Sequence, residues 1–302
     1  MDRVLEYEIP SEYDGANITT VLKQHFKIST NLIKDLKKYK EGIQVNGEHK
    51  RVVDLAAKGD ILKITIRDTA SENIVPTDIL LDIVYEDEDV LVINKPSNMP
   101  THPSMGNYEN SLANGVMYYY KSKGEERVFR AVNRLDKDTS GLIIVAKTNK
   151  AHEILGEYFK NHSIKREYIA LLCGVLPHDT ATIDAPIGRD EKNRLRMTVT
   201  PNNSKRAITH LQVLKRYKDY TLVKARLETG RTHQIRVHTK YIGYPVYNDP
   251  VYASKSEGDF GQFLHSYSME FIHPLTKEKM YFKREVPKYF KDFLDKLEKE
   301  EL

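Results

Sequence analysis

Residues 133–146 read Asn-Arg-Leu-Asp-Lys-Asp-Thr-Ser-Gly-Leu-Ile-Ile-Val-Ala, a charged turn that runs directly into an apolar stretch. The last five residues, 142–146, carry no polar side chain and predict a buried strand. The turn before them places Arg134, Asp136 and Asp138 close to the start of that strand. Polar loops beside buried strands are where functional sites are usually built, so this segment is the first candidate for a site.

Strands outnumber helices on either side of this segment. We expect strands at residues 83–85, 90–93, 168–172, 208–214 and 221–227, and helices around 112–120, 154–159, 235–242 and 290–297. Several strands follow one another directly in the sequence. We therefore predict an α+β domain over residues 81–302, in which helices flank a mixed, mainly antiparallel β-sheet.

The N-terminal residues 10–67 have the pattern of a small separate module. Ile18, Leu22 and Phe26 recur at a spacing of four and predict one short amphipathic helix. Two short strands are expected at residues 43–45 and 61–64. Residues 68–80, which are polar and contain one proline, are interpreted as the linker to the larger domain.

A second helix in this module carries Lys34, Lys37 and Lys38. Two short helices, a few strands and a lysine-bearing helix resemble the RNA-binding module first seen in small-subunit ribosomal protein S-four. The resemblance implies that these three lysines contact RNA. A lysine-rich helix face is also typical of simple solvation, so that alternative stays open.

The composition limits the class of protein. The chain has 302 residues, of which 40% are hydrophobic and 30% charged, as in folded globular proteins. Because Cys173 is the single cysteine, an internal disulfide and a thiolate metal cluster are excluded. The sequence contains no run of eighteen apolar residues, and its first residues lack the pattern of a secretory signal. We therefore expect a cytoplasmic protein without a membrane partner.

Charge is unevenly distributed along the chain. The net charge of +4 does not by itself indicate nucleic acid. Residues 187–216, however, contain eight basic side chains, Arg189 and Arg194 among them, against two acidic ones. Such an excess suits a surface that faces phosphate groups, and it suits a solvated hairpin equally well.

Three further segments combine charged residues with apolar strands. They are residues 94–103, Asn-Lys-Pro-Ser-Asn-Met-Pro-Thr-His-Pro; 165–171, Lys-Arg-Glu-Tyr-Ile-Ala-Leu; and 228–238, Glu-Thr-Gly-Arg-Thr-His-Gln-Ile-Arg-Val-His. The last contains His233 and His238. Their separation of five residues does not suit a shared metal site on one helix face, so no metal is expected.

Taken in order, these segments and residues 133–142 resemble the A-type pseudouridine synthases, which act on large-subunit ribosomal RNA and on transfer RNA. The similarity runs from about residue 83 to residue 287. Its most specific element is the pair formed by Arg-Leu-Asp-x-x-Thr-Ser-Gly and the downstream Gly-Arg-Thr-His-Gln-Ile-Arg. The sequence departs from the family at Asn133, where the family usually has histidine.

The resemblance implies a specific chemistry. Uridine loses its nitrogen-to-sugar bond, the base rotates, and it rejoins the sugar through carbon 5, without any redox step. No cofactor is therefore expected. Asp136 would be the nucleophile, attacking either the uracil ring or the anomeric carbon of the sugar. A nucleophilic carboxylate must be ionised, which a nearby cation favours, and the family match assigns that cation to Arg231.

The resemblance also implies how RNA is held. A target base inside an RNA helix must be flipped out before it can react. Tyr168 would stack on the flipped base, Arg134 would fill the vacated space, and Ile235 would form a wall of the pocket. Thr139 is a further expected substrate-binding residue.

Other interpretations of these residues stay open. Taken singly, Asp136 suits a turn, Tyr168 a core strand and Arg231 a surface ion pair. The pair Asp136 and Asp138 also resembles the aspartates of haloacid-dehalogenase-type phosphatases, but no apolar strand precedes it and no acidic pair follows. A non-enzymatic RNA-binding protein with a decayed synthase domain is a further alternative, which only Asn133 favours.

The expected partner is RNA. Because the N-terminal module resembles a ribosomal one, we expect a structured ribosomal RNA as the substrate, with transfer RNA as the alternative. A monomer is the default expectation for the oligomeric state.

Overall fold

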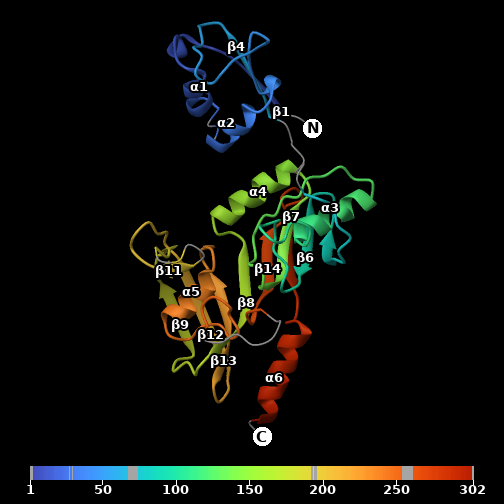
Figure 1. The fold of residues 1–302 in the computed structure, drawn as a ribbon, viewed down its shortest axis with the longest axis vertical. Helices are drawn as coiled ribbons and strands as arrows, with labels where there is room; N and C mark the ends of the chain where they lie inside the picture. Colours follow the sequence, from blue (N-terminus) through green and yellow to red (C-terminus); the bar gives the residue numbers. More distant parts are fainter. Residues whose placement is uncertain are drawn as a thin grey trace. The chain divides into compact units, whose positions relative to one another are not determined.

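The computed structural model describes residues 3–26, 28, 30–66, 74–191, 193, 196–253 and 261–300. The chain divides into two compact units, Met1–Glu72 and Asn73–Leu302 (Figure 1). Each unit has a hydrophobic core of its own. In the part of the chain that the structure describes, no helix is both long enough and apolar enough to cross a membrane.

The first unit contains a four-stranded antiparallel sheet with short helices. Its elements are β1 (Arg3–Glu8), η1 (Ser11–Tyr13), α1 (Ile18–Gln24), α2 (Thr30–Leu36), η2 (Lys40–Gly42), β2 (Ile43–Val45), β3 (Glu48–His49) and β4 (Ile61–Ile66), with the strands in the order β1-β4-β2-β3. Strand β1 was not predicted and lies upstream of residue 10. It pairs with β4 along its length, from Arg3 opposite Ile66 to Glu8 opposite Ile61, so the unit includes these residues.

A single sheet dominates the second unit. It contains β5 (Asp82–Glu86), β6 (Val90–Lys95), β7 (Ser140–Ala146), β8 (Lys165–Cys173), β9 (Thr180–Asp184), β12 (Ile208–Arg216), β13 (Tyr220–Leu227), β14 (Leu264–Ile272) and β15 (Lys279–Lys283). The order is β5-β6-β7-β14-β8-β13-β12-β9, and β15 pairs with β14. Strands β7 and β14 pair in parallel, and the other described pairs of this sheet are antiparallel. The predicted mixed, mainly antiparallel sheet is confirmed.

The close approach of β7 to β14 depends on Gly141. Its φ is +109°, a conformation that side-chain-bearing residues rarely adopt. A Cβ atom there would lie 2.3 Å from the carbonyl oxygen of Ser266 on β14. Glycine therefore allows β7 to run beside β14 directly after the charged turn of residues 133–139.

Four helices accompany the sheet in the described part of this unit. They are α3 (Leu112–Ser122), α4 (Asn149–Lys160), α5 (Gln234–Tyr241) and α6 (Lys288–Glu300), which confirms the predicted helices. Ser111 and Asn114 form a capping box at the start of α3, and the Thr148 hydroxyl accepts a hydrogen bond from the Ala151 N–H at the start of α4.

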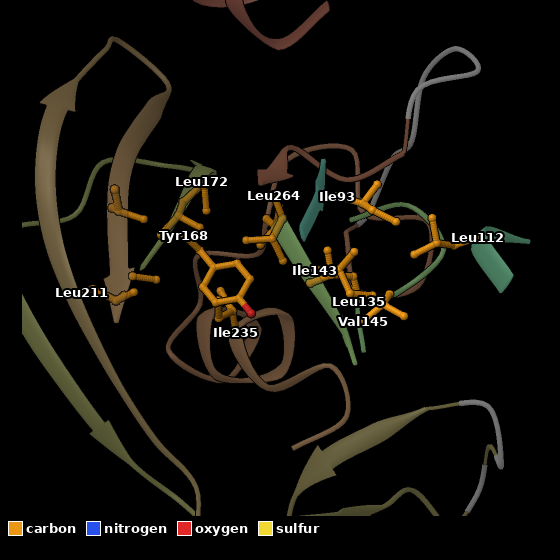
Figure 2. Packing of buried hydrophobic residues seen from close by; sticks show 14 of the residues in the cluster. Ile93, Leu112, Leu135, Ile143, Val145, Tyr168, Leu172, Leu211, Ile235 and Leu264 are labelled. Atoms are coloured by element: carbon orange, nitrogen blue, oxygen red, sulfur yellow. The ribbon is translucent and has the colours of Figure 1, made fainter. Parts of the chain in front are cut away.

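The core of this unit lies around β8, which the sheet order places between β14 and β13 (Figure 1). Figure 2 shows side chains of this core from the sheet, from α3, from α5 and from the turn before β7: Ile93, Leu112, Leu135, Ile143, Val145, Tyr168, Leu172, Leu211, Ile235 and Leu264. The apolar run 142–146 is fully buried, as its sequence predicts. The charged turn that precedes it is thereby attached to a completely buried strand.

Two connecting segments complete this unit. Residues 74–80, part of the predicted linker, pack on it: the Asn114 side chain donates to the Val75 carbonyl at 2.7 Å, and the Thr77 N–H donates to the Asn114 carbonyl at 3.2 Å. Residues 68–73 of that linker lie outside the described residues. Strands β10 (Ile187–Arg189) and β11 (Met197–Val199) form a separate two-stranded hairpin.

Candidate active site

The turn that carries Asp136 is held by the loop that follows β6. The Lys95 ammonium group is completely buried and donates to three backbone carbonyls, one of which, that of Lys137 at 3.1 Å, belongs to the turn. The Thr101 hydroxyl donates to the Leu135 carbonyl at 2.9 Å. Burial lowers the pKa of Lys95 to about 7, against the opposing charges of the nearby aspartates. The backbone around Asp136 is thus fixed on both sides.

Asp136 makes its strongest contact with Arg236. Its Oδ2 atom accepts a hydrogen bond from Arg236 Nη1 at 2.8 Å. The same guanidinium donates through Nε and Nη2 to the two oxygens of Asp249, at 2.7 and 2.9 Å. The Asp249 side chain is fully buried, whereas that of Asp136 is 27% exposed. One arginine therefore joins a buried anchoring carboxylate to a carboxylate that faces a cavity.

The charges around Arg236 favour its protonated form. Burial lowers the pKa of Arg236, but the hydrogen bond to Asp249 and the charges of Asp136 and Asp249 outweigh that effect and raise it above its ordinary value. His233 lies 3.8 Å from Asp136, measured from Nε2 to Oδ1, and its Nδ1 is 2.9 Å from the Tyr252 hydroxyl. Burial lowers the pKa of His233, which favours the neutral imidazole. Among the described residues, the arginine that forms an ion pair with Asp136 is Arg236.

The expected pairing of Asp136 with Arg231 is corrected by this geometry. Arg231 lines the same cavity, but its Nε donates to the Arg206 carbonyl at 3.0 Å. The cause is the way in which α5 begins. His233 adopts a left-handed conformation with φ of +56°, and the helix starts directly after it. Arg231 is left in the loop, and Arg236 points inward from the first turn of the helix.

Gln234 fixes this loop. Its Oε1 accepts hydrogen bonds from the Thr229 hydroxyl at 2.8 Å and from the Arg231 N–H at 3.0 Å, and its Nε2 donates to the Ile208 carbonyl at 2.9 Å. His238, further along α5, has both ring nitrogens within 2.9 Å of protein oxygens. The polar residues of this motif therefore hold the start of α5 against β12.

Tyr168 and Ile235 line a narrow recess beside Asp136. Tyr168 lies near the middle of β8, opposite Ala225 on β13 and Ser266 on β14, and it is 5% exposed. Figure 2 shows its ring directed toward Ile235 of α5. The structure thus brings these two predicted pocket residues together with the predicted nucleophile.

The recess opens into a cavity of about 630 Å³. Its charged lining consists of Arg134, Asp136, Lys137, Asp138, Arg166, Arg231 and Arg236. Arginine and lysine side chains outnumber carboxylates in it, and one carboxylate, that of Asp136, is already paired with Arg236. Such a cavity suits an anionic ligand.

Two further predicted residues lie in or beside the turn. Arg134 is exposed and lines the cavity, as expected for a residue that reaches RNA. Thr139 is 2% exposed: its hydroxyl accepts a hydrogen bond from Gln262 at 2.8 Å, and its N–H donates to the Asp136 carbonyl at 3.1 Å. Within the described structure these bonds shape the turn.

Asn133, which departs from the family pattern, is buried at the start of this turn. Its Oδ1 accepts a hydrogen bond from the Ile144 N–H of β7 at 2.8 Å, while its Nδ2 has no hydrogen-bond partner among the described residues. Asn133 is 3% exposed and is one of the residues that line the cavity. Its described hydrogen bond holds the backbone of β7.

The described part of the basic segment 187–216 contains basic side chains that are exposed and others that pair with carboxylates. Arg189 is exposed at the end of β10, and Arg194 lies outside the described residues. Three other basic residues of the segment pair with carboxylates: Arg206 with Asp184 at 2.8 Å, Lys215 with Glu298 at 3.0 Å and Arg216 with Asp179 at 2.7 Å. Pairing reduces the charge that this segment can offer to phosphate groups.

In the first unit, Lys34, Lys37 and Lys38 are exposed in and just after α2. Lys38 is 72% exposed and pairs with Asp35 at 2.6 Å. Their exposure is compatible with RNA contact and equally with solvation.

Comparison with known proteins bears on the whole arrangement. The sequence model of a family described as RNA pseudouridylate synthase matches residues 89–241, half of the chain. The match runs from the start of β6 to the end of α5, and so includes Asp136, Tyr168 and Arg236. The chain belongs to the RNA pseudouridylate synthase family. The second unit is accordingly the catalytic unit of a pseudouridine synthase, an isomerase that converts uridine in RNA to pseudouridine.

Relatives of this synthase match over most of its length. The uncharacterized RNA pseudouridine synthase YlyB of Bacillus subtilis is 44% identical over 261 residues, covering 85% of this chain and 86% of the relative. Ribosomal large subunit pseudouridine synthase D of Pseudomonas aeruginosa is 35% identical over 302 residues, covering 94% and 92%. Among solved structures, human RNA pseudouridylate synthase domain containing 1 has a TM-score of 0.60 at 27% identity, covering 70% of this chain and 85% of that one.

Proposed function

We propose that this synthase isomerises uridines in structured ribosomal RNA and that Asp136 is its nucleophile. One observation carries the proposal: the Asp136 carboxylate faces a cationic cavity and is held by Arg236, which is itself anchored on the buried Asp249. The names of relatives from Pseudomonas aeruginosa and Zymomonas mobilis, both large-subunit ribosomal enzymes, support ribosomal RNA as the substrate.

The hydrogen bonds at Asp136 suit a nucleophile. Arg236 cannot turn away, because two of its nitrogens are bound to Asp249, so its Nη1 fixes the Oδ2 atom of Asp136. The Oδ1 atom accepts no hydrogen bond from the described residues and is available for attack on the substrate. A carboxylate held in one orientation avoids the entropic cost of positioning it during the reaction.

The reaction then proceeds without net loss of atoms. The bond between N1 of uracil and C1′ of ribose breaks, the base rotates within the site, and a bond between C5 and C1′ forms. The hydrogen on C5 leaves as a proton, and N1 gains one. Asp136 forms a transient covalent bond, either to the uracil ring or to the anomeric carbon of the sugar. This bond breaks again when the product forms, and the carboxylate is regenerated.

The cavity also suits a flipped-out base. Tyr168 offers an aromatic face and Ile235 an apolar wall, and both lie beside Asp136. Stacking on an aromatic ring tolerates rotation of the base, because both isomers present a π face. The exposed Arg134, two residues before Asp136 in the same turn, is placed to enter the RNA stack when the base leaves it.

Tritium release tests this proposal. Unmodified large-subunit ribosomal RNA labelled with tritium at C5 of uridine is incubated with the wild-type protein and with Asp136→Asn. We expect release by the wild type and a loss of at least about 1,000-fold in the variant, whose RNA binding is retained. Release by Asp136→Asn at a rate close to that of the wild type would remove Asp136 from this role.

A further inference from the structure

Arg166 is a buried arginine in the catalytic cavity to which the mechanism above assigns no role. It lies on β8 two residues before Tyr168, so both side chains project from the same face of the sheet. It lines the same cavity as Asp136 and is 5% exposed. Arg166 belongs to the segment 165–171, in which the sequence assigned a role to Tyr168 alone.

The positive charge of Arg166 has no counter-ion. No carboxylate oxygen of the described residues lies within 4.0 Å of its guanidinium, and none of those residues makes a hydrogen bond with it. Its Nε atom is buried without any partner. A guanidinium stays protonated at any physiological pH, and a buried charge is unfavourable unless something pairs with it. In the free protein, the buried charge of Arg166 therefore lacks the anion that would stabilise it.

An aromatic contact nevertheless holds the guanidinium in place. Its central carbon lies 4.2 Å from the centre of the Phe159 ring of α4. On Gly230, a Cβ atom would lie 3.2 Å from Arg166 Nη1 and 3.4 Å from the Phe159 ring. The absence of a side chain at Gly230 thus leaves room for the guanidinium. Stacking on a ring uses none of the N–H groups of the guanidinium. These donors are therefore held in one orientation and remain available to a ligand.

The chemistry of the substrate identifies the ligand. The base of uridine is neutral, so the anionic groups that RNA brings into this cavity are its phosphodiesters. A planar guanidinium donates two parallel hydrogen bonds to phosphate oxygens. We propose that Arg166 binds a backbone phosphate at or next to the target uridine and so sets the position of the ribose relative to Asp136. This inference rests on the proposed action on RNA.

Lys165 provides a matched control. It neighbours Arg166 in the sequence, but its side chain is 69% exposed and pairs with Glu270 at 2.9 Å. Adjacent residues of a strand project to opposite faces, so Lys165 does not share the position of Arg166. Removing its charge alters the net charge of the protein by the same amount as removing that of Arg166.

The test is the salt dependence of RNA binding by the full chain, with unmodified large-subunit ribosomal RNA transcribed in vitro as the probe. We expect Arg166→Gln to weaken binding roughly 10-fold at low salt and to reduce the slope of log affinity against log salt by about 0.7 to 0.9, the loss of one phosphate contact. Lys165→Gln should match the wild type. Arg166→Lys keeps the charge, so it should retain the slope while binding more weakly than the wild type.

Affinity and slope for folded Arg166→Gln that equal those of Lys165→Gln would overturn the inference. If Arg166→Gln does not fold, a reduced slope in Arg166→Lys would also contradict it, because the charge is retained. Binding is measured without turnover. The two proposals can therefore fail separately. If the wild type releases no tritium but Arg166→Gln still reduces the slope of log affinity against log salt, the proposed reaction is refuted and the phosphate contact is supported.

Discussion

The charges at Asp136 and the charges on the exposed basic surfaces are organised in opposite ways. Arg236 is 3% exposed and is fixed by three hydrogen bonds to two carboxylates. Lys38 of the first unit is 72% exposed and contacts one exposed carboxylate, that of Asp35. Buried pairs impose one geometry, whereas exposed pairs contribute little and rearrange easily. The first arrangement suits chemistry, and the second suits salt-dependent affinity.

The largest effect is expected from removing the buried anchor. Asp249→Ala should lower the free energy of unfolding by about 3–5 kcal/mol, because it leaves the Arg236 charge buried with one partner fewer. Urea unfolding monitored by circular dichroism measures it. Asp184→Ala is the control, since Asp184 forms an exposed pair with Arg206, and it should leave the free energy of unfolding almost unchanged. If both substitutions lower the free energy of unfolding by the same amount, the proposed difference between buried and exposed ion pairs is wrong.

A second effect should appear as pH falls. His265 is buried next to the turn, with Nδ1 2.9 Å from the Ser140 hydroxyl and Nε2 3.0 Å from the Arg284 carbonyl, and burial lowers its pKa to about 4. The unfolded chain binds this proton near pH 6.5 and the folded protein near pH 4. The free energy of unfolding should therefore be unaffected by this group above pH 6.5 and should fall by about 3 kcal/mol between pH 6.5 and 4.

Comparison of His265→Gln with the wild type isolates this contribution. The variant should be less stable at pH 7, and its stability should decline less steeply between pH 6.5 and 4. A decline as steep as that of the wild type would show that other groups control acid unfolding.

The smallest effect should come from the exposed lysines. Combined replacement of Lys34, Lys37 and Lys38 by glutamine should lower RNA affinity by roughly 10-fold at low salt and leave the turnover number unchanged, because exposed lysines contribute through phosphate neutralisation. Titrations at several KCl concentrations measure the affinity, and tritium release at saturating RNA measures turnover. An unaltered salt slope would indicate that α2 simply faces solvent.

Much of the fold could be predicted from apolar patterns. The runs at 90–93, 142–146 and 168–172 are buried strands, because their sheet is covered on both faces. Strands of this kind have continuous hydrophobic sequences and are therefore easily predicted. Strand β1 was missed, although Leu5 and Tyr7 alternate with Glu6 and Glu8 in the way that predicts a half-buried strand.

The candidate site was predictable in its residues but not in its pairing. Two arginines five positions apart follow the same glycine, and only the left-handed turn at His233 decides which one faces Asp136. Asp249 is far from Asp136 in the sequence. Its role as the partner of Arg236 becomes visible only in the folded structure, where α5 brings the two side chains together. Arg166 escaped notice because a basic residue on a strand normally projects to solvent. Its burial depends on Phe159 and Gly230, which belong to other elements.

Comparison of the two arginines tests directly which of them positions Asp136. Tritium release from C5-labelled ribosomal RNA would be measured for Arg236→Gln, Arg236→Lys and Arg231→Gln, each normalised to the folded fraction. If Arg236 positions the nucleophile, Arg236→Gln should lose at least about 100-fold in turnover. Arg236→Lys should recover part of that loss, and Arg231→Gln should retain most of the activity. A larger loss for Arg231→Gln than for Arg236→Gln would contradict the assignment.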